Sequence, residues 1–162
     1  MNASPPATKI LLIGIGNSGR SDDALGWKFL DTFDAFPCWF DFEYRYQLQV
    51  EDAELISRYK KVIFVDASRE VIKDGASLHA CIPTPSASFT THKLDPGTVL
   101  WLARELYTAQ TEAYVMAIAG TEWELHHGLS TIARTNLQKA LSLFLDFILH
   151  ANLLQPKAEA VA

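Results

Sequence analysis

The sequence has few of the features that mark secreted or membrane proteins. It contains only two cysteines in 162 residues, Cys38 and Cys81, far apart and in no metal-type spacing such as Cys-x-x-Cys. We therefore expect two reduced thiols, each a small buried hydrophobic side chain, rather than a disulfide. The N-terminus has no basic residue before Lys9 and no long apolar run, so it lacks the layout of a secretory signal.

Long apolar runs and an excess of positive charge are also missing. The longest C-terminal apolar stretch, 140–154, is interrupted by Asp146 and His150 and is too short to span a bilayer. The formal net charge of -5 argues against a general binder of phosphate backbones, which usually carries a clustered basic surface. We predict a cytoplasmic protein whose partners include neither nucleic acid nor a membrane.

What the sequence does contain is enough apolar material for one folded unit. Its hydrophobic fraction of 49% and charged fraction of 20% are typical of globular proteins. A chain of 162 residues buries a substantial core without disulfides or a structural metal. We predict a single domain over residues 8–154, with flexible ends at 1–7 and 155–162.

Five segments have strand patterns. The apolar runs 8–15, 61–66 and 113–119 are typical of central parallel strands, which are buried on both faces. Residues 40–50 alternate apolar and polar side chains, which indicates a strand with one buried face at the edge of a sheet. Residues 77–82 are a weaker strand candidate.

Helical segments are expected between and after these strands. They cover residues 24–36, 51–59, 95–107 and 131–153. The alternation of strands and helices predicts an α/β fold: a mostly parallel twisted sheet with helices on both faces, in a single three-layer domain. Seven side chains at helical spacing are expected in the core: Trp101, Leu102, Leu106, Leu141, Phe144, Leu145 and Ile148.

A glycine-rich turn follows the first strand. Residues 14–19, Gly-Ile-Gly-Asn-Ser-Gly, match the Gly-x-Gly-x-x-Gly pattern of dinucleotide-binding sites. In such sites the helix starts inside the motif, whereas here Ser21, Asp22 and Asp23 intervene and would place carboxylates near the phosphate position. We favour a tight strand-to-helix turn whose helix is capped by Asp22. A non-catalytic nucleotide- or partner-binding module that uses this turn is the alternative function.

Three metal-competent side chains, Asp23, Asp66 and His92, each come just after a probable strand. Ligands of parallel α/β sheets bind beyond the carboxyl ends of the strands, so we expect these side chains to converge there. Carboxylate oxygens with an imidazole nitrogen suit nickel, zinc, iron or cobalt, and three protein ligands leave open positions for water or substrate. Four residues of the turn are expected to support this site: Gly14, Gly16, Asn17 and Asp22.

Four motifs in a fixed order extend over most of the chain, from about Lys9 to Leu149. They are Gly-Ile-Gly-Asn at 14–17 with Arg-Ser-Asp-Asp-Ala-Leu-Gly at 20–26, Val-Asp-Ala at 65–67, Thr-His-Lys-Leu at 91–94, and Gly120 through Glu124 to Gly-Leu-Ser at 128–130. Together they resemble the motifs of the hydrogenase maturation proteases. Position 23 is Asp where some members have Glu, and position 24 is Ala where Gly is common, but neither difference removes a ligand.

The resemblance implies an α/β endopeptidase that removes a C-terminal extension from the large-subunit precursor of a nickel-iron hydrogenase. It also implies that Asp23, Asp66 and His92 are the metal-binding and catalytic residues. The nickel is expected to be supplied by the substrate rather than held by the free enzyme, and other divalent metals are expected to substitute for it. Activation of the attacking water by the metal and activation by a carboxylate are both open. A relative that binds the precursor without cutting it is a further possibility.

Overall fold

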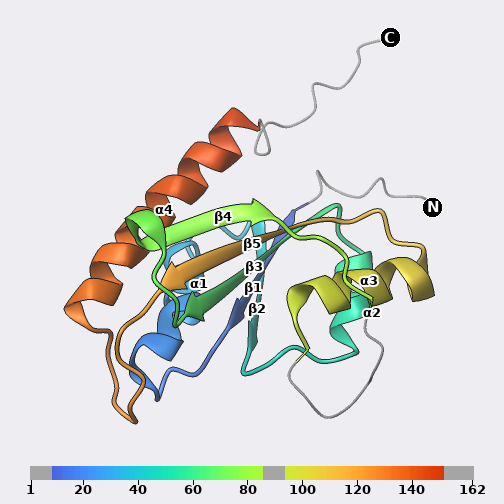
Figure 1. Cartoon of the computed structure of the whole chain (residues 1–162). Helices are drawn as coiled ribbons and strands as arrows, with labels where there is room; N and C mark the ends of the chain where they lie inside the picture. The colour runs from blue at the N-terminus through green and yellow to red at the C-terminus, as the bar shows by residue number, and fades with distance from the viewer. Residues whose placement is uncertain (1–8, 86–93, 152–162) are drawn as a thin grey trace.

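A five-stranded sheet lies between two layers of helices in the computed structural model, which describes residues 9–85 and 94–151 (Figure 1). The strands are β1 (Ile10–Ile15), β2 (Phe40–Arg45), β3 (Lys61–Ser68), β4 (Ala76–Ala80) and β5 (Glu112–Ala119). The helices are α1 (Leu25–Thr32), α2 (Asp52–Ser57), α3 (Pro96–Tyr107) and α4 (Thr131–His150), with 3-10 turns η1 (Ser21–Ala24) and η2 (Lys73–Gly75). The predicted flexible ends, 1–7 and 155–162, lie outside the described residues.

The strand order is β2-β1-β3-β5-β4, and only the β4–β5 pair is antiparallel. This confirms the predicted α/β class and the mostly parallel sheet, and it places the alternating strand β2 at an edge. The strand β2 ends at Arg45, whereas its predicted range ran to 50. Beyond it the chain turns toward α2, and Leu48 forms only an isolated bridge to Leu94.

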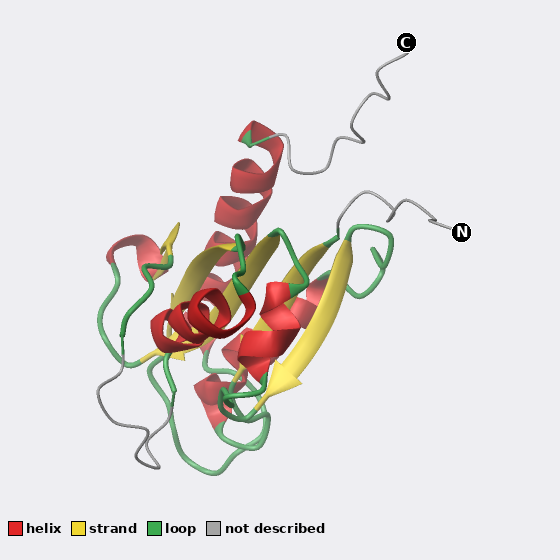
Figure 2. Ribbon diagram, turned by 90° about the vertical axis from the view of Figure 1, so that its right-hand side faces the viewer, coloured by secondary structure: helices red, strands yellow, loops and turns green. Residues whose placement is uncertain are grey.

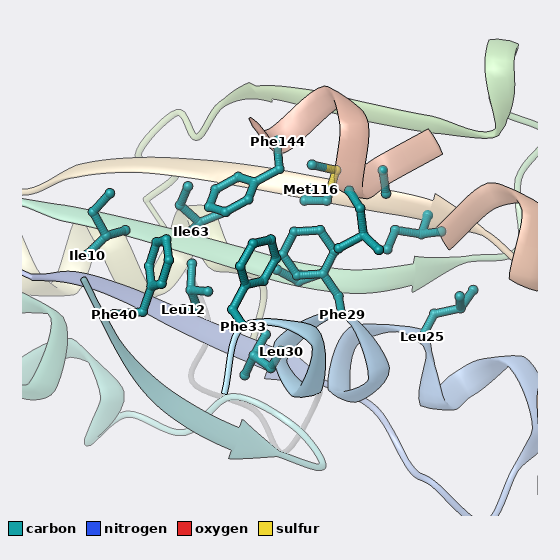
Figure 3. Close-up of a cluster of buried hydrophobic side chains, with 14 of the residues drawn as sticks. Ile10, Leu12, Leu25, Phe29, Leu30, Phe33, Phe40, Ile63, Met116 and Phe144 are labelled. Atoms are coloured by element: carbon teal, nitrogen blue, oxygen red, sulfur yellow. The ribbon is translucent and has the colours of Figure 1, made fainter. Parts of the chain in front are cut away.

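Helices cover both faces of the sheet, as predicted (Figure 2). On the face covered by α1 and α4, the rings of Phe29 and Phe33 pack against Phe144, with centroids 5.3 and 5.1 Å away (Figure 3). On the other face, α2 and α3 cover a second core that includes Leu11 and Ile13 of β1. Because the alternate residues of β1 enter different cores, this strand is apolar throughout.

Two of the predicted core positions are wrong. Leu106 is 60% exposed in the last turn of α3, and Leu145 is 45% exposed because it lies about 100° around α4 from the buried Phe144. Trp101 is half-buried. The other four predicted positions are buried: Leu102, Leu141, Phe144 and Ile148.

The two cysteines differ in their surroundings. Cys38 is exposed in the connection between α1 and β2, which contradicts the prediction that it is buried. Cys81 is partly buried, and this burial raises the pKa of its thiol to about 11. Both are free thiols, as expected. Across residues 9–85 and 94–151, every helix is too short or too polar to cross a membrane.

Candidate active site

Asp23 and Asp66 both lie beside the end of β1. Asp66 is paired in register with Ile15, the last residue of that strand. Asp23 packs against the next residue, Gly16: its carboxyl carbon is 3.9 Å, and its peptide oxygen 1.9 Å, from the position that a Cβ of Gly16 would take. The two predicted carboxylates are therefore brought to the carboxyl edge of the central strands.

The donor chemistry of this pair fits a divalent metal. Asp23 and Asp66 are both half-buried, and carboxylate oxygens suit hard and borderline divalent ions. Within the described parts of the chain, no three His, Cys, Asp or Glu side chains form a group that could hold a metal ion. The third predicted ligand, His92, lies outside these parts, so the structure brings together two of the three predicted residues.

Asp22 anchors a distant loop. Its carboxylate is fully buried and accepts hydrogen bonds from the amides of Thr121 at 2.7 Å, Glu122 at 2.9 Å and Ser130 at 2.8 Å, and from the Ser130 hydroxyl at 2.8 Å. Burial alone would raise the pKa of Asp22, but these hydrogen bonds outweigh it and hold the pKa below its ordinary value of 3.8. The prediction that Asp22 caps the following helix is wrong, because neither η1 nor α1 has a side-chain cap.

Two glycines let α1 approach the strand ends. A Cβ on Gly14 would lie 2.8 Å from the carbonyl oxygen of Gly26. A Cβ on Gly26 would lie 2.5 Å from the carbonyl oxygen of Val65 and 2.6 Å from that of Ile15. Since all three distances are too short for a side chain, these glycines are needed where the helix begins against β1 and β3.

The glycine turn itself is filled by the protein's own backbone. Gly16 has a φ of 150°, and the space beside it is taken by the peptide oxygen of Asp23, which also accepts a hydrogen bond from the Asn17 amide at 3.2 Å. The side-chain oxygen of Asn17 accepts a hydrogen bond from the Gly19 amide at 2.8 Å. The turn therefore positions Asp23, and its shape does not favour a bound pyrophosphate. That Gly16 and Asn17 support a metal site stays a prediction.

A hollow of about 420 Å³ opens beside η1 at the same edge of the sheet. It is lined by Ser21, Arg69, residues 121–124 and His126, and we call it the edge pocket. The guanidinium carbon of Arg69 lies over the ring of Trp123, 4.3 Å from its centroid. Sequence reasoning missed this pair, because two residues from separate loops show no local pattern that would join them.

Solved structures share this fold. Hydrogenase maturating endopeptidase HybD from Escherichia coli matches with a TM-score of 0.62 and 18% identity, over 88% of this chain and 93% of that one. The [NiFe] hydrogenase maturation protease HycI from Thermococcus kodakarensis KOD1 matches with a TM-score of 0.66 and 19% identity, over 90% and 94%. No family model and no curated protein matches the sequence. The structural likeness confirms the fold that the sequence resemblance implies.

Proposed function

We propose that this protein is an endopeptidase that removes the C-terminal extension from the large-subunit precursor of a nickel-iron hydrogenase. The observation that carries the proposal is the placement of Asp23 and Asp66 beside the end of β1. The fold around them is one that solved structures named as hydrogenase maturation endopeptidases also have. These carboxylates lie where ligands of parallel α/β sheets bind.

In this proposal the enzyme recognises nickel that the precursor already carries. Asp23, Asp66 and His92 complete the coordination of that nickel, because carboxylate and imidazole groups are suitable ligands for it. Binding of the metal then holds the neighbouring tail of the precursor against the sheet edge, which supplies the orientation that peptide hydrolysis requires. Precursors without the metal are not held, so extension removal follows metal insertion.

The cleavage step adds one water across the scissile peptide bond. The water oxygen bonds to the carbonyl carbon, the bond from that carbon to nitrogen breaks, and the water proton is transferred to the leaving amine. Asp23 or Asp66 takes this proton from the water and passes it on as a general base and then acid. The bound nickel supplies polarisation of the water or of the carbonyl.

The surroundings of the two carboxylates are suited to positioning. Asp23 is held by the hydrogen bond that its peptide oxygen accepts from the Asn17 amide and by its close packing against Gly16. Asp66 belongs to a central strand that is paired on both sides, with β1 and with β5. Rigid elements of this kind keep reacting groups within the narrow range of positions that catalysis needs.

The test is the intact mass of each nickel-iron hydrogenase large subunit in cells that lack this protein. We expect a large subunit that keeps its extension, that is trimmed when the wild-type protein is restored, and that stays untrimmed with Asp23→Asn. A matched control is Asp34→Asn, which removes an exposed carboxylate from the turn after α1 and should restore trimming. Normal trimming in cells without this protein, and without a redundant protease, would contradict the proposal.

A further inference from the structure

We propose that the edge pocket binds the polypeptide tail of the precursor and that Arg69 pairs with a carboxylate of this tail. The inference rests on the proposed function, whose catalytic carboxylates lie at the same edge of the sheet. It assigns a substrate-binding residue, Arg69, outside the set of metal ligands.

The segments that line the edge pocket each follow the end of one of the three central strands, β1, β3 and β5. Ser21 belongs to η1, two residues before Asp23. Arg69 directly follows the last residue of β3 and comes three residues after Asp66. Residues 121–124 follow the end of β5. A polypeptide whose scissile bond lies at the two carboxylates therefore has neighbouring residues within reach of the pocket.

Arg69 is held in place without being neutralised. Its guanidinium carbon lies 4.3 Å from the centroid of the Trp123 ring, within the range of cation–π attraction. Within residues 9–85 and 94–151 it forms no ion pair, although Glu122 and Glu124 line the same pocket. The N–H donors of a guanidinium form a planar fork that matches a carboxylate. Arg69 therefore presents an unused site for a carboxylate in the lining of the edge pocket.

The loop that lines the edge pocket together with Arg69 is held by hydrogen bonds before any ligand binds. The amides of Thr121 and Glu122 donate to the Asp22 carboxylate at 2.7 and 2.9 Å. The Ser21 hydroxyl donates to the carbonyl oxygen of Glu124 at 2.9 Å, and the Ser21 amide donates to that of His126 at 2.8 Å. A preformed wall lowers the entropy lost when a flexible tail is bound.

The charged side chains that line the pocket determine where a carboxylate of the bound tail can lie. Glu122 and Glu124 repel an anion, so a carboxylate of the tail is stable only beside Arg69. The volume of about 420 Å³ is within the range of pockets that enclose small ligands, and it accommodates a short stretch of polypeptide. The tail thus binds in one direction, with its carboxylate toward the loop that follows β3.

The test is the steady-state cleavage of purified, nickel-containing precursor by the full-length protein. We expect Arg69→Gln to raise KM by about 10-fold and to leave kcat within about twofold, since the residue binds the tail and does not take part in bond breaking. Arg58→Gln is the matched control. It removes an exposed arginine that directly follows α2 and pairs with Glu54 of that helix. We expect this control to keep the wild-type KM.

Variants of the precursor identify the carboxylate that pairs with Arg69. Each Asp or Glu of the tail is changed to Asn or Gln in turn, and in a further variant the terminal carboxylate is displaced by added glycines. We expect one of these changes to reproduce the rise in KM, and Arg69→Gln to add nothing further to it, as for two groups that contact each other. Additive effects of all such pairs would contradict the pairing.

A synthetic peptide with the sequence of the tail separates this inference from the proposed function. Calorimetric titration that shows binding to the wild type and at least about 10-fold weaker binding to Arg69→Gln supports the pocket even where no cleavage occurs. Equal affinity of both proteins, or no binding to either, overturns the inference even where the precursor is cut. The inference is also overturned if the peptide binds more weakly only to the double variant Glu122→Gln with Glu124→Gln. That result would mean that the pocket binds a basic side chain of the tail.

Discussion

Asp22 accepts two hydrogen bonds from Ser130, the residue that caps α4. The amide and the hydroxyl of Ser130 each donate to the Asp22 carboxylate at 2.8 Å, and the same hydroxyl accepts a hydrogen bond from the Ala133 amide at 3.1 Å. The residue next to the catalytic candidate Asp23 is thereby joined to the start of the last helix. Residues 121–124, which line the edge pocket, belong to the loop that ends at Ser130. The position of this loop therefore depends on the hydrogen bonds between Asp22 and Ser130.

Replacement of Asp22 by Asn is expected to lower the free energy of unfolding by about 3 kcal/mol. The Asn side chain has a single acceptor oxygen and brings two donors of its own, so amides of the 121–130 loop that donate to Asp22 lose their partner. Urea denaturation followed by circular dichroism measures the change. Asp34→Asn serves as the control, because this carboxylate is exposed, and should change the same quantity by less than about 0.5 kcal/mol. Equal stability of the two variants would show that the Asp22 contacts are not stabilising.

The stabilising effect of Asp22 is expected to be lost in acid. Its hydrogen bonds hold the folded-state pKa below the ordinary value of 3.8, so the unfolded chain takes up the proton first as the pH falls. The contribution is therefore fully present above the unfolded pKa and disappears as the pH falls through the lower, folded one. We expect the stability difference between wild type and Asp22→Asn to narrow between about pH 5 and pH 2. A difference that stays constant with pH would contradict this assignment.

The strands were predictable because strands buried on both faces need uninterrupted apolar residues. The runs 61–66 and 113–119 correspond to β3 and β5, and each ends within two residues of its predicted end. The edge strand β2 was predicted five residues too long, since alternation of side chains continues through 46–50 after the backbone has left the sheet. Local pattern therefore identifies strands better than it locates their ends.

Part of the candidate site follows from a rule about sheets, and part does not. Asp23 and Asp66 were expected at the carboxyl edge because each was predicted to follow a parallel strand. The structure places both at this edge, with Asp66 among the last three residues of β3. The roles of Asp22 and Arg69 were not predictable, because each depends on residues of the 121–130 loop that are far away in the sequence. The position of His92 is still a prediction, since this residue lies outside the described parts of the chain.

Replacement of Gly16 by Ala is expected to damage both stability and activity. The new Cβ would lie 1.9 Å from the peptide oxygen of Asp23, in a residue whose φ is 150°, so the turn has to move. We expect a loss of about 3 kcal/mol or more in unfolding free energy and a shift of the Asp23 carboxylate that lowers cleavage. Gly128→Ala is the matched comparison, because Gly128 has a φ of 102° and nothing lies within 4 Å of its added Cβ.

The comparison separates backbone strain from steric overlap. Gly128→Ala is expected to lose only about 1–2 kcal/mol, the strain of a side chain at positive φ. We would measure the thermal unfolding of both variants, and their cleavage of the precursor at a temperature where both are folded. Equal losses in the two variants would mean that the turn at Gly16 yields easily and does not hold Asp23.

Removal of nickel from the precursor is expected to prevent cleavage. In the proposed function the metal arrives with the substrate, so a nickel-free precursor lacks the group that Asp23 and Asp66 bind. Gel mobility and intact mass of the precursor, with and without nickel, measure the outcome. Pretreatment of the enzyme alone with a chelator, followed by its removal, should leave cleavage of the nickel-containing precursor unchanged. Cleavage of both precursors at one rate would exclude nickel recognition.

Substitution of either carboxylate is expected to abolish most of the activity without unfolding the protein. Asp23→Asn and Asp66→Asn keep the size of side chains that are only half-buried, so the fold should persist, as circular dichroism can check. Each is expected to reduce kcat/KM by at least about 10²-fold, because each removes one ligand or the base of the same reaction. The double variant should be little worse than either single variant, since residues that act as a unit are not additive. If the double loss were instead the product of the single losses, the two carboxylates would act independently, and the shared site at the end of β1 would be wrong.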